Sequence, residues 1–224
     1  FGLSAKRTLQ IAQALYERHK VLTYPRTDSR YLPEDNIGNV KAAFTKLEIP
    51  DLAEHARKAL AQGWVRPNNR IFNNSKVTDH HAIIPTGVST KTLDDFELKV
   101  YDMVARRFVA AFYPAAQFEV TTRITRVEGE AFKTDGKIIT DPGWLAVYGK
   151  QAAGTDDQNV CAIRSGETAR TEALEIKENE TKPPPRYTEA TLLSAMEGAG
   201  KLVDDEELRE AMSQRGLGTS ETSV

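Results

Sequence analysis

Two side chains placed two residues apart, Tyr24 and Arg26, could act on a single ligand. They flank Pro25 in the stretch TYPRTDSR, and in an extended backbone residues two apart project from the same face. A tyrosine hydroxyl has an ordinary pKa of about 10, so it becomes a good nucleophile only when its proton is taken or its anion is stabilised. A guanidinium can hold a phosphate through two parallel hydrogen bonds. The pair therefore suits attack on a phosphodiester, although the spacing alone also fits a buried tyrosine beside a surface arginine.

A second candidate is the histidine pair in DHHAIIPT. His80 and His81 are two of the four histidines of the chain, and a histidine can shuttle a proton or contact a phosphate near neutral pH. Adjacent histidines lack the usual spacing of metal ligands, and no cysteine lies nearby. The alternative is a solvated pair at the edge of a loop.

Several basic and aromatic residues could form a surface for nucleic acid. Cations would follow the phosphate backbone and aromatic rings would stack on bases. The candidates are Arg30, Arg66, Arg70, Lys76, Arg106 and Arg107, with Tyr31, Trp64 and Phe72 for stacking. Arg186, which follows three prolines in PPPRY, could also face a groove. Because the formal net charge is −2, scattered solvated charge is the alternative.

The bulk composition indicates an ordinary soluble globular protein. The chain has 224 residues, of which 40% are hydrophobic and 28% charged, enough for one large domain or two small ones. The single cysteine, Cys161, excludes an internal disulfide and a multi-cysteine metal site. No apolar run approaches a membrane span, no signal peptide opens the chain, and a cytoplasmic location is expected. Because the chain starts at Phe1 and stops after a glycine-rich turn, it is expected to be a piece of a longer protein.

The elements that would position these residues are mainly helical in the first half. Ser4 should cap a helix that ends near His19, and Leu9, Ala12, Leu15 and Tyr16 lie on its apolar face. A short strand is predicted at residues 21–24. Further helices are predicted from Pro33, across residues 51–62 and across residues 92–114. Two apolar faces are expected to be buried: Val40, Ala43, Phe44 and Leu47 on the second helix, and Leu98, Tyr101, Val104, Ala105, Phe108 and Phe112 on the last. Residues 63–87 show almost no hydrophobic periodicity, so they should form an ordered loop.

The second half begins with a β-rich region. Strands are predicted at residues 118–132 and 134–148, with a hairpin signal in TDGK, and shorter strands at 161–181. A stiff proline linker and a helix capped by Thr188 follow, and residues 204–212 should start a last acidic helix. The expected fold class is therefore α+β, in the order helical, β and helical.

Three motifs together resemble one family. The chain resembles the type IA DNA topoisomerases, and the topoisomerase III branch of bacteria is nearest. The resemblance rests, in this order and spacing, on LTYPRTDSRYLPED, SKVTDHHAIIPT and PPPRYTEATLLSAME followed by RGLGT. The resemblance implies three domains: a helical lid over residues 1–114, a β-rich arch segment over 115–182, and part of a helical single-strand-binding domain over 183–224.

The resemblance also implies the site residues. Tyr24 matches the nucleophile that cuts one DNA strand and leaves a 5′-phosphotyrosine link and a free 3′-hydroxyl. Arg26 matches the arginine that positions the phosphate, and His80 matches a histidine that contacts this phosphate. Arg186 matches a basic position of the PPPRYTEA motif. Together with Arg30 and Lys76, taken from the basic residues named above, it is expected to bind DNA. Arg26 and His80 lie 54 positions apart, so residues 66–86 must fold back against the tyrosine.

The partners are implied in the same way. Single-stranded DNA is the expected substrate, and no ATP site is needed because the covalent link conserves the energy of the phosphodiester. The N-terminal Toprim domain of the family, with its acidic magnesium cluster, is not present in this sequence, and the sequence shows no D-x-D-x-E cluster. Mg²⁺ is therefore expected to bind the missing domain, and this chain alone is expected to be inactive. The alternatives are a non-catalytic single-strand-binding module, in which Tyr24 stacks on a base, and a tyrosine-type integrase, which would need a tyrosine near its C-terminus.

Overall fold

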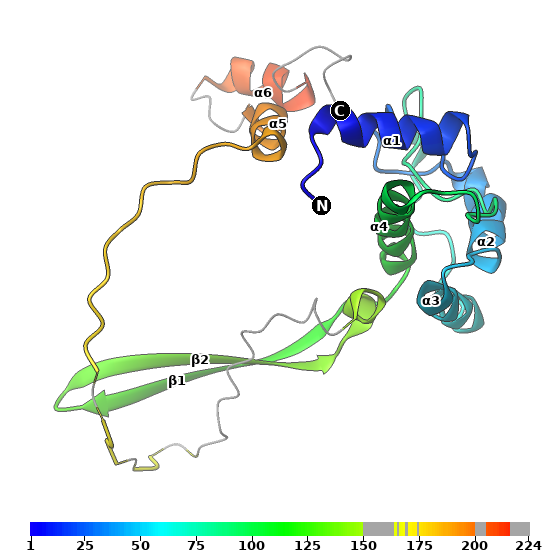
Figure 1. Cartoon of the computed structure of the whole chain (residues 1–224). Coiled ribbons are helices and arrows are strands. Elements are labelled where there is room, and N and C mark those ends of the chain that lie inside the picture. Colours follow the sequence, from blue (N-terminus) through cyan, green and yellow to red (C-terminus); the bar gives the residue numbers. More distant parts are fainter. Residues whose placement is uncertain (150–163, 165, 169, 174, 200–204, 216–224) are drawn as a thin grey trace.

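Helices α1 to α4 form one body in the N-terminal half of the computed structural model (Figure 1). The structure describes residues 1–149, 164, 166–168, 170–173, 175–199 and 205–215. The helices of this body are α1 (Ala5–Glu17), α2 (Ile37–Thr45), α3 (Pro50–Ala61) and α4 (Asp95–Ala111). A short 3₁₀ helix, Glu34–Asn36, leads into α2.

Side-chain caps fix where α1 and α4 begin. The Ser4 hydroxyl accepts the N–H of Arg7 at 3.2 Å, which confirms the predicted cap of the first helix. At α4 the Asp94 carboxylate accepts the N–H groups of Phe96 and Glu97, while Glu97 accepts the N–H of Asp94 at 3.0 Å. Each cap satisfies backbone donors that have no partner inside the helix.

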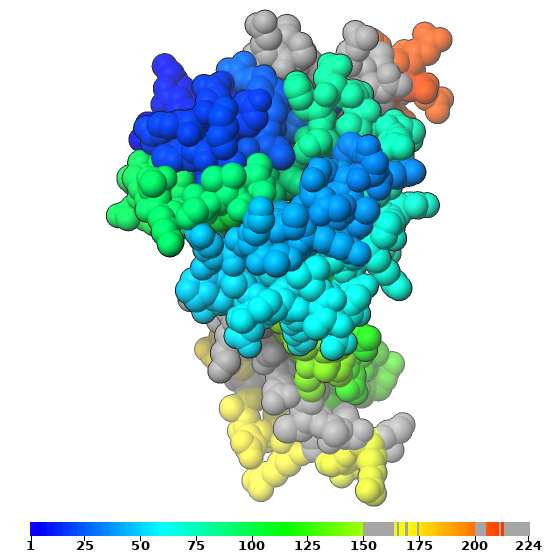
Figure 2. All heavy atoms as spheres, turned by 90° about the vertical axis from the view of Figure 1, so that its right-hand side faces the viewer, coloured from blue at the N-terminus to red at the C-terminus, as the bar shows by residue number. Residues whose placement is uncertain are grey.

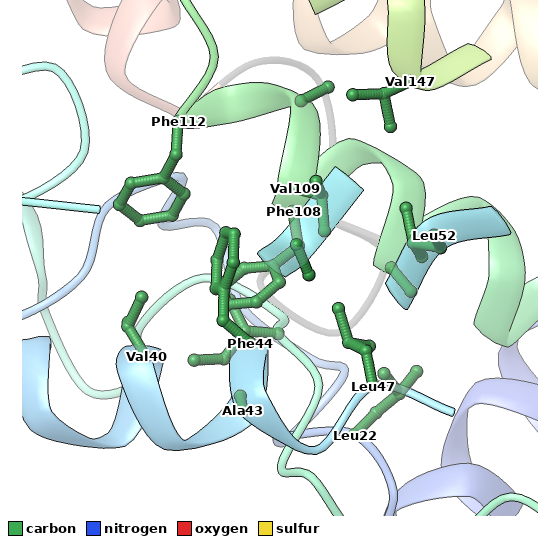
Figure 3. Close-up of a cluster of buried hydrophobic side chains, with 14 of the residues drawn as sticks. Leu22, Val40, Ala43, Phe44, Leu47, Leu52, Phe108, Val109, Phe112 and Val147 are labelled. Atoms are coloured by element: carbon green, nitrogen blue, oxygen red, sulfur yellow. The ribbon is translucent and has the colours of Figure 1, made fainter. Parts of the chain in front are cut away.

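The core of the body lies between α2 and α4 and is rich in aromatic rings (Figure 3). The Phe44 ring lies 4.8 Å from that of Phe108 and 5.2 Å from that of Phe112, measured between centroids. The predicted buried face of α2 is confirmed, including Leu47 just after the helix. On α4 the prediction for Leu98 is wrong, because this residue is 41% exposed. Glu97 is buried instead and contacts Arg18 and His19 just after α1, so Leu98 lies one residue off the buried stripe.

A long antiparallel hairpin follows the body. It consists of β1 (Gln117–Val127) and β2 (Glu130–Asp141), joined by Glu128 and Gly129. Their φ angles are +50° and +87°, as a two-residue type I′ turn requires. The hairpin signal predicted at TDGK is wrong, because Gly136 pairs with Thr121 in the middle of the ladder.

The hairpin is rooted in the helical body at a tight joint. The strand predicted to continue through residues 143–148 is wrong, since Gly143–Tyr148 forms a 3₁₀ helix. Gly143 has a φ of +47°, and a Cβ on it would stand 2.6 Å from the backbone of Ala115. The N–H of Trp144 donates to the carbonyl of Pro114 at 3.0 Å, and Arg106 on α4 donates to the carbonyl of Val147 at 3.0 Å. These contacts tie both ends of the hairpin to α4.

The C-terminal part returns to helix. Residues 175–187 are exposed and contain no strand, so the short strands predicted at 161–181 are wrong wherever the structure describes them; the other positions, Cys161 among them, lie outside the described residues. The Thr188 hydroxyl accepts the N–H of Thr191 at 3.2 Å, which confirms the predicted cap of α5 (Glu189–Glu197). Helix α6 covers Glu206–Arg215.

The α+β class and the order helical, β, helical are confirmed. The three domain boundaries remain predictions. Across the described residues, no helix is both long and apolar enough to cross a membrane.

Candidate active site around Tyr24

Tyr24 lies on an irregular segment, residues 20–32, called here the tyrosine segment. The strand predicted at 21–24 is wrong: it is reduced to one isolated bridge between Leu22 and Pro85, because a proline has no N–H with which to extend the ladder. The hydrogen bonds next to this bridge come from Thr23. Its N–H donates to the carbonyl of Ile84 at 3.0 Å, and its hydroxyl accepts the N–H of Ile84 at 2.9 Å.

The partner of the tyrosine segment is the return segment, residues 71–86. The far ends of the two segments are also joined, because Leu32 donates to the carbonyl of Ile71 at 2.8 Å and Ala82 donates to that of Tyr31 at 2.9 Å. The two segments lie next to each other on the molecular surface, in blue and turquoise (Figure 2). The predicted fold-back of residues 66–86 against the tyrosine is therefore confirmed over the return segment.

The structure brings His80 against Tyr24. The two rings are 4.2 Å apart between centroids and tilted by 40°. Tyr24 is half-buried, whereas His80 is exposed, so its ring nitrogens can reach a ligand from solvent. The Thr27 hydroxyl donates to the carbonyl of His80 at 2.8 Å and fixes the histidine backbone beside the tyrosine segment. His81 has a different partner: its Nδ1 lies 2.8 Å from the carbonyl of Ala82.

Helix α1 forms the other wall of the site. The Tyr16 and Tyr24 rings pack edge to face, with centroids 5.3 Å apart and planes at 82°. When the Gln13 amide oxygen faces the exposed Arg26 guanidinium, it accepts from Nε at 3.2 Å and from Nη2 at 3.1 Å. Residues three apart on a helix are surface neighbours. Gln13 therefore places Arg26 beside the ring that packs on the tyrosine.

The three residues predicted to bind DNA differ in their positions. Lys76 lies in the return segment, where Nζ donates to the Tyr31 hydroxyl at 3.1 Å and stands 4.7 Å from the centre of that ring. Arg30 is exposed at the end of the tyrosine segment and pairs with Glu197 of α5 at 2.5 Å. Arg186 lies in the exposed stretch before α5, and none of the contacts described for residues 20–32 and 71–86 includes it.

Three partners in the site were missed by the sequence reasoning. Tyr16 was placed on the apolar face of the first helix, which gave a signal for packing but not for its contact with Tyr24. Gln13 precedes it by almost one helical turn and carried no signal of its own. Glu197 is 167 positions from Arg30, and no local pattern connects two residues so far apart.

The arrangement suits an anionic ligand held beside a phenol. Arg26 presents donors that match a phosphate, and an exposed histidine lies against the tyrosine ring. Among the residues described by the structure, no cluster of three or more His, Cys, Asp or Glu side chains could hold a metal ion. The magnesium ion implied by the family resemblance therefore finds no fitting ligand set in this part of the chain.

Comparisons with known proteins agree on one family. A family model described as DNA topoisomerase matches residues 1–223. Proteins named DNA topoisomerase 3 from Bacillus licheniformis and Bacillus cereus are 39% and 41% identical to the chain, each over 99% of its length. The chain spans about a third of these relatives, 32% of each.

The solved structure of full-length topoisomerase I from Thermotoga maritima supports the fold. It matches the whole chain with a TM-score of 0.54 and 24% identity, over 33% of its own length. At this level of identity the likeness concerns the fold alone.

Proposed function

We propose, because this chain belongs to the DNA topoisomerase family, that it supplies the strand-cleaving tyrosine of a type IA, topoisomerase III-like enzyme. In this proposal Tyr24 attacks one strand of DNA, the strand stays linked to the protein while another passes, and the break is then resealed. The observation that carries the proposal is the contact of Tyr24 with His80, whose rings lie 4.2 Å apart at the junction of the tyrosine and return segments.

The chemical step is a transesterification. The Tyr24 oxygen forms a bond to phosphorus while the bond from phosphorus to the 3′ oxygen of the strand breaks. The phenol loses its proton and the leaving 3′ oxygen gains one, so the products are a 5′-phosphotyrosine and a 3′-hydroxyl. One phosphate ester replaces another, and religation is the same step in reverse, which explains why no nucleotide energy source is required.

The neighbours of Tyr24 would help in different ways. Arg26 keeps its charge at any working pH and can hold two phosphate oxygens at once. His80 is exposed, and its protonated form would add a second positive charge at the same phosphate. Tyr16 and Gln13 fix the phenol and the guanidinium before the DNA arrives, which lowers the entropy lost in reaching the reactive geometry.

The remaining parts of the machinery would come from the parent protein. We infer that a Toprim domain, outside this sequence, faces the Tyr24 site and holds Mg²⁺, which would supply positive charge for the phosphate when bound. The substrate is single-stranded DNA, with Arg30, Lys76 and Arg186 as further contacts. The 224-residue chain alone would then bind DNA without cleaving it.

Two variants of the parent protein test the roles of Arg26 and His80. Arg26→Ala and His80→Ala should each lower the rate of oligonucleotide cleavage by about a hundredfold or more, the range for removing a group that stabilises charge at a reacting centre. Binding of the same oligonucleotide should fall by less than about tenfold, as expected for the loss of one solvent-exposed ionic contact.

Matched controls separate the site from general charge effects. His81→Ala removes the neighbouring imidazole, and Arg57→Ala removes an exposed guanidinium from α3; both should cleave at nearly the parental rate. Equal losses of cleavage in the site variants and the controls would contradict the assignment. Binding without any cleavage by the intact parent protein would favour a non-catalytic binding module.

A further inference from the structure

We propose that α5 acts as a latch: its Glu189 and Glu197 side chains hold it against α1 and the tyrosine segment. A DNA phosphate would open this latch by displacing Glu197 from Arg30. The proposal rests on the proposed function in one respect, the role of Arg30 as a DNA contact. It adds a residue from a distant part of the chain, Glu197, that would control access to this contact.

Helix α5 reaches the helical body through an acidic side chain at each end. Oε2 of Glu189 accepts the N–H of Ala5, the first residue of α1, at 2.7 Å. Oε1 of Glu197 pairs with Nη2 of Arg30 at 2.5 Å. The two carboxylates are eight residues apart, about 12 Å along a helix. One short helix therefore joins the start of α1 to the end of the tyrosine segment, and in Figure 1 it lies near the N-terminal end of α1.

These contacts can open because they are polar and exposed. No residue within α5 is buried, and the core cluster of the helical body draws its members from residues 11–147. The Arg30 side chain is 79% exposed to solvent and the Glu197 side chain is 69% exposed. An exposed ion pair of this kind shifts an equilibrium by at most about fivefold, so a modest competitor can release it.

The two contacts would respond differently to DNA. A phosphate can bind the Arg30 guanidinium through two hydrogen bonds and would take the place of the Glu197 carboxylate. The displaced carboxylate would then be repelled by the phosphate that replaced it. Glu189 binds a backbone N–H at the positive end of α1, where no predicted DNA contact lies. Strand binding would therefore open the latch from its Glu197 end.

Distance measurements on the intact 224-residue chain test the latch without DNA. Spin labels would be attached at Lys41→Cys on α2 and Leu192→Cys on α5, both exposed, with Cys161→Ser to remove the native thiol. One narrow distance distribution is expected at low salt. Glu197→Gln should broaden it toward longer distances, and so should adding a single-stranded dT oligonucleotide. A distribution that neither Glu197→Gln nor the oligonucleotide changes would overturn the latch.

Oligonucleotide affinity tests the competition. Glu197→Gln should tighten binding of a labelled dT 15-mer by about threefold to fivefold at low salt. Glu130→Gln, the same charge change at the hairpin turn, should tighten it less than 1.5-fold, which is within ordinary assay scatter for a distant surface charge. In an Arg30→Gln background the effect of Glu197→Gln should disappear, because the two residues act on one contact.

The Arg30→Gln variant distinguishes a failed latch from a failed DNA contact. If Arg30→Gln weakens binding but Glu197→Gln has no effect, the latch is wrong and the DNA contact stands. If neither variant changes binding, Arg30 is not a DNA contact, and the displacement mechanism fails with it. Equal tightening by Glu197→Gln and Glu130→Gln would also overturn the latch, because the effect would then be one of overall charge.

Discussion

Replacing Glu97 by alanine should destabilise the helical body and loosen the end of α1 that precedes Tyr24. Glu97 is only 4% exposed. Its carboxylate accepts from Arg18 at 2.5 Å and from the N–H of Asp94 at 3.0 Å, and it lies 3.1 Å from Nε2 of His19. Arg18 and His19 directly follow α1, so this one buried carboxylate joins the start of α4 to the end of α1.

The size of the effect can be assembled from these three contacts. The His19 ring, whose Nε2 accepts from Arg18 and lies 3.1 Å from Oε2 of Glu97, would face a gap in place of the carboxylate, and this loss of packing costs about 1.5 kcal/mol. Loss of the reciprocal cap at Asp94 costs about 1 kcal/mol. The Arg18 side chain is 66% exposed, so its pair contributes roughly 0.5 kcal/mol. The expected loss is therefore on the order of 3 kcal/mol in the free energy of unfolding, which lies at the low end of the range for breaking a buried ion pair.

Urea unfolding followed by tryptophan fluorescence measures this loss; one of the two reporters, Trp64, packs 4.8 Å from the Tyr113 ring between centroids. With a slope of about 2 kcal/mol per molar urea, the midpoint should fall by about 1.5 M. Glu97→Gln keeps the shape and one cap acceptor, so it should cost about half as much. Glu17→Ala, an exposed change on α1, is the control. A loss below about 1 kcal/mol for Glu97→Ala, or one equal to that of Glu17→Ala, would refute the reasoning.

Two further predictions concern the joint between the helical body and the hairpin. Burial is the main cause that lowers the pKa of His55, whose Nδ1 lies 3.0 Å from the Tyr113 hydroxyl. The folded state therefore resists protonation: this contribution to stability is present above the unfolded pKa of about 6.5 and is lost as the pH falls through the lowered folded value. Urea titrations between pH 7.5 and 5 should show a steeper decline for the parent chain than for His55→Gln, and parallel profiles would contradict this. Gly143→Ala should cost roughly 1–3 kcal/mol, measured by thermal unfolding, because its φ is +47° and a Cβ would stand 2.6 Å from the Ala115 backbone. A loss below about 0.5 kcal/mol would show that the joint can adjust.

Local patterns in the sequence were enough to predict most of the helices. The caps at Ser4 and Thr188 and the buried face of α2 depend on residues within a few positions of one another, so propensity and period reveal them. The turn of the hairpin was placed wrongly because two glycine-containing pairs compete. Asp135–Gly136 has the stronger turn preference, but Glu128–Gly129 divides the β-branched run into two strands of matching length.

The candidate site could be predicted only in part. The chemistry of Tyr24 and Arg26 follows from their types and spacing, and the family motifs pointed to His80. The return segment shows no hydrophobic periodicity in its sequence. Its backbone groups form hydrogen bonds with the tyrosine segment about 60 positions away, not with a regular pattern of its own residues. Contacts of this kind, like that of Glu197 with Arg30, depend on tertiary folding and leave no local trace in the sequence.

The most direct test of the central claim is to trap the covalent intermediate of the parent protein on an end-labelled single-stranded oligonucleotide. A label on the 3′ side of the cut should stay with the protein in denaturing gels, a label on the 5′ side should be released, and peptide mass mapping should find the nucleotide on Tyr24. Tyr24→Phe, which keeps the ring between Tyr16 and His80 but lacks the hydroxyl, should bind the oligonucleotide and form no adduct. An adduct on another residue, retention of the 5′ label, or an adduct in Tyr24→Phe would contradict the account.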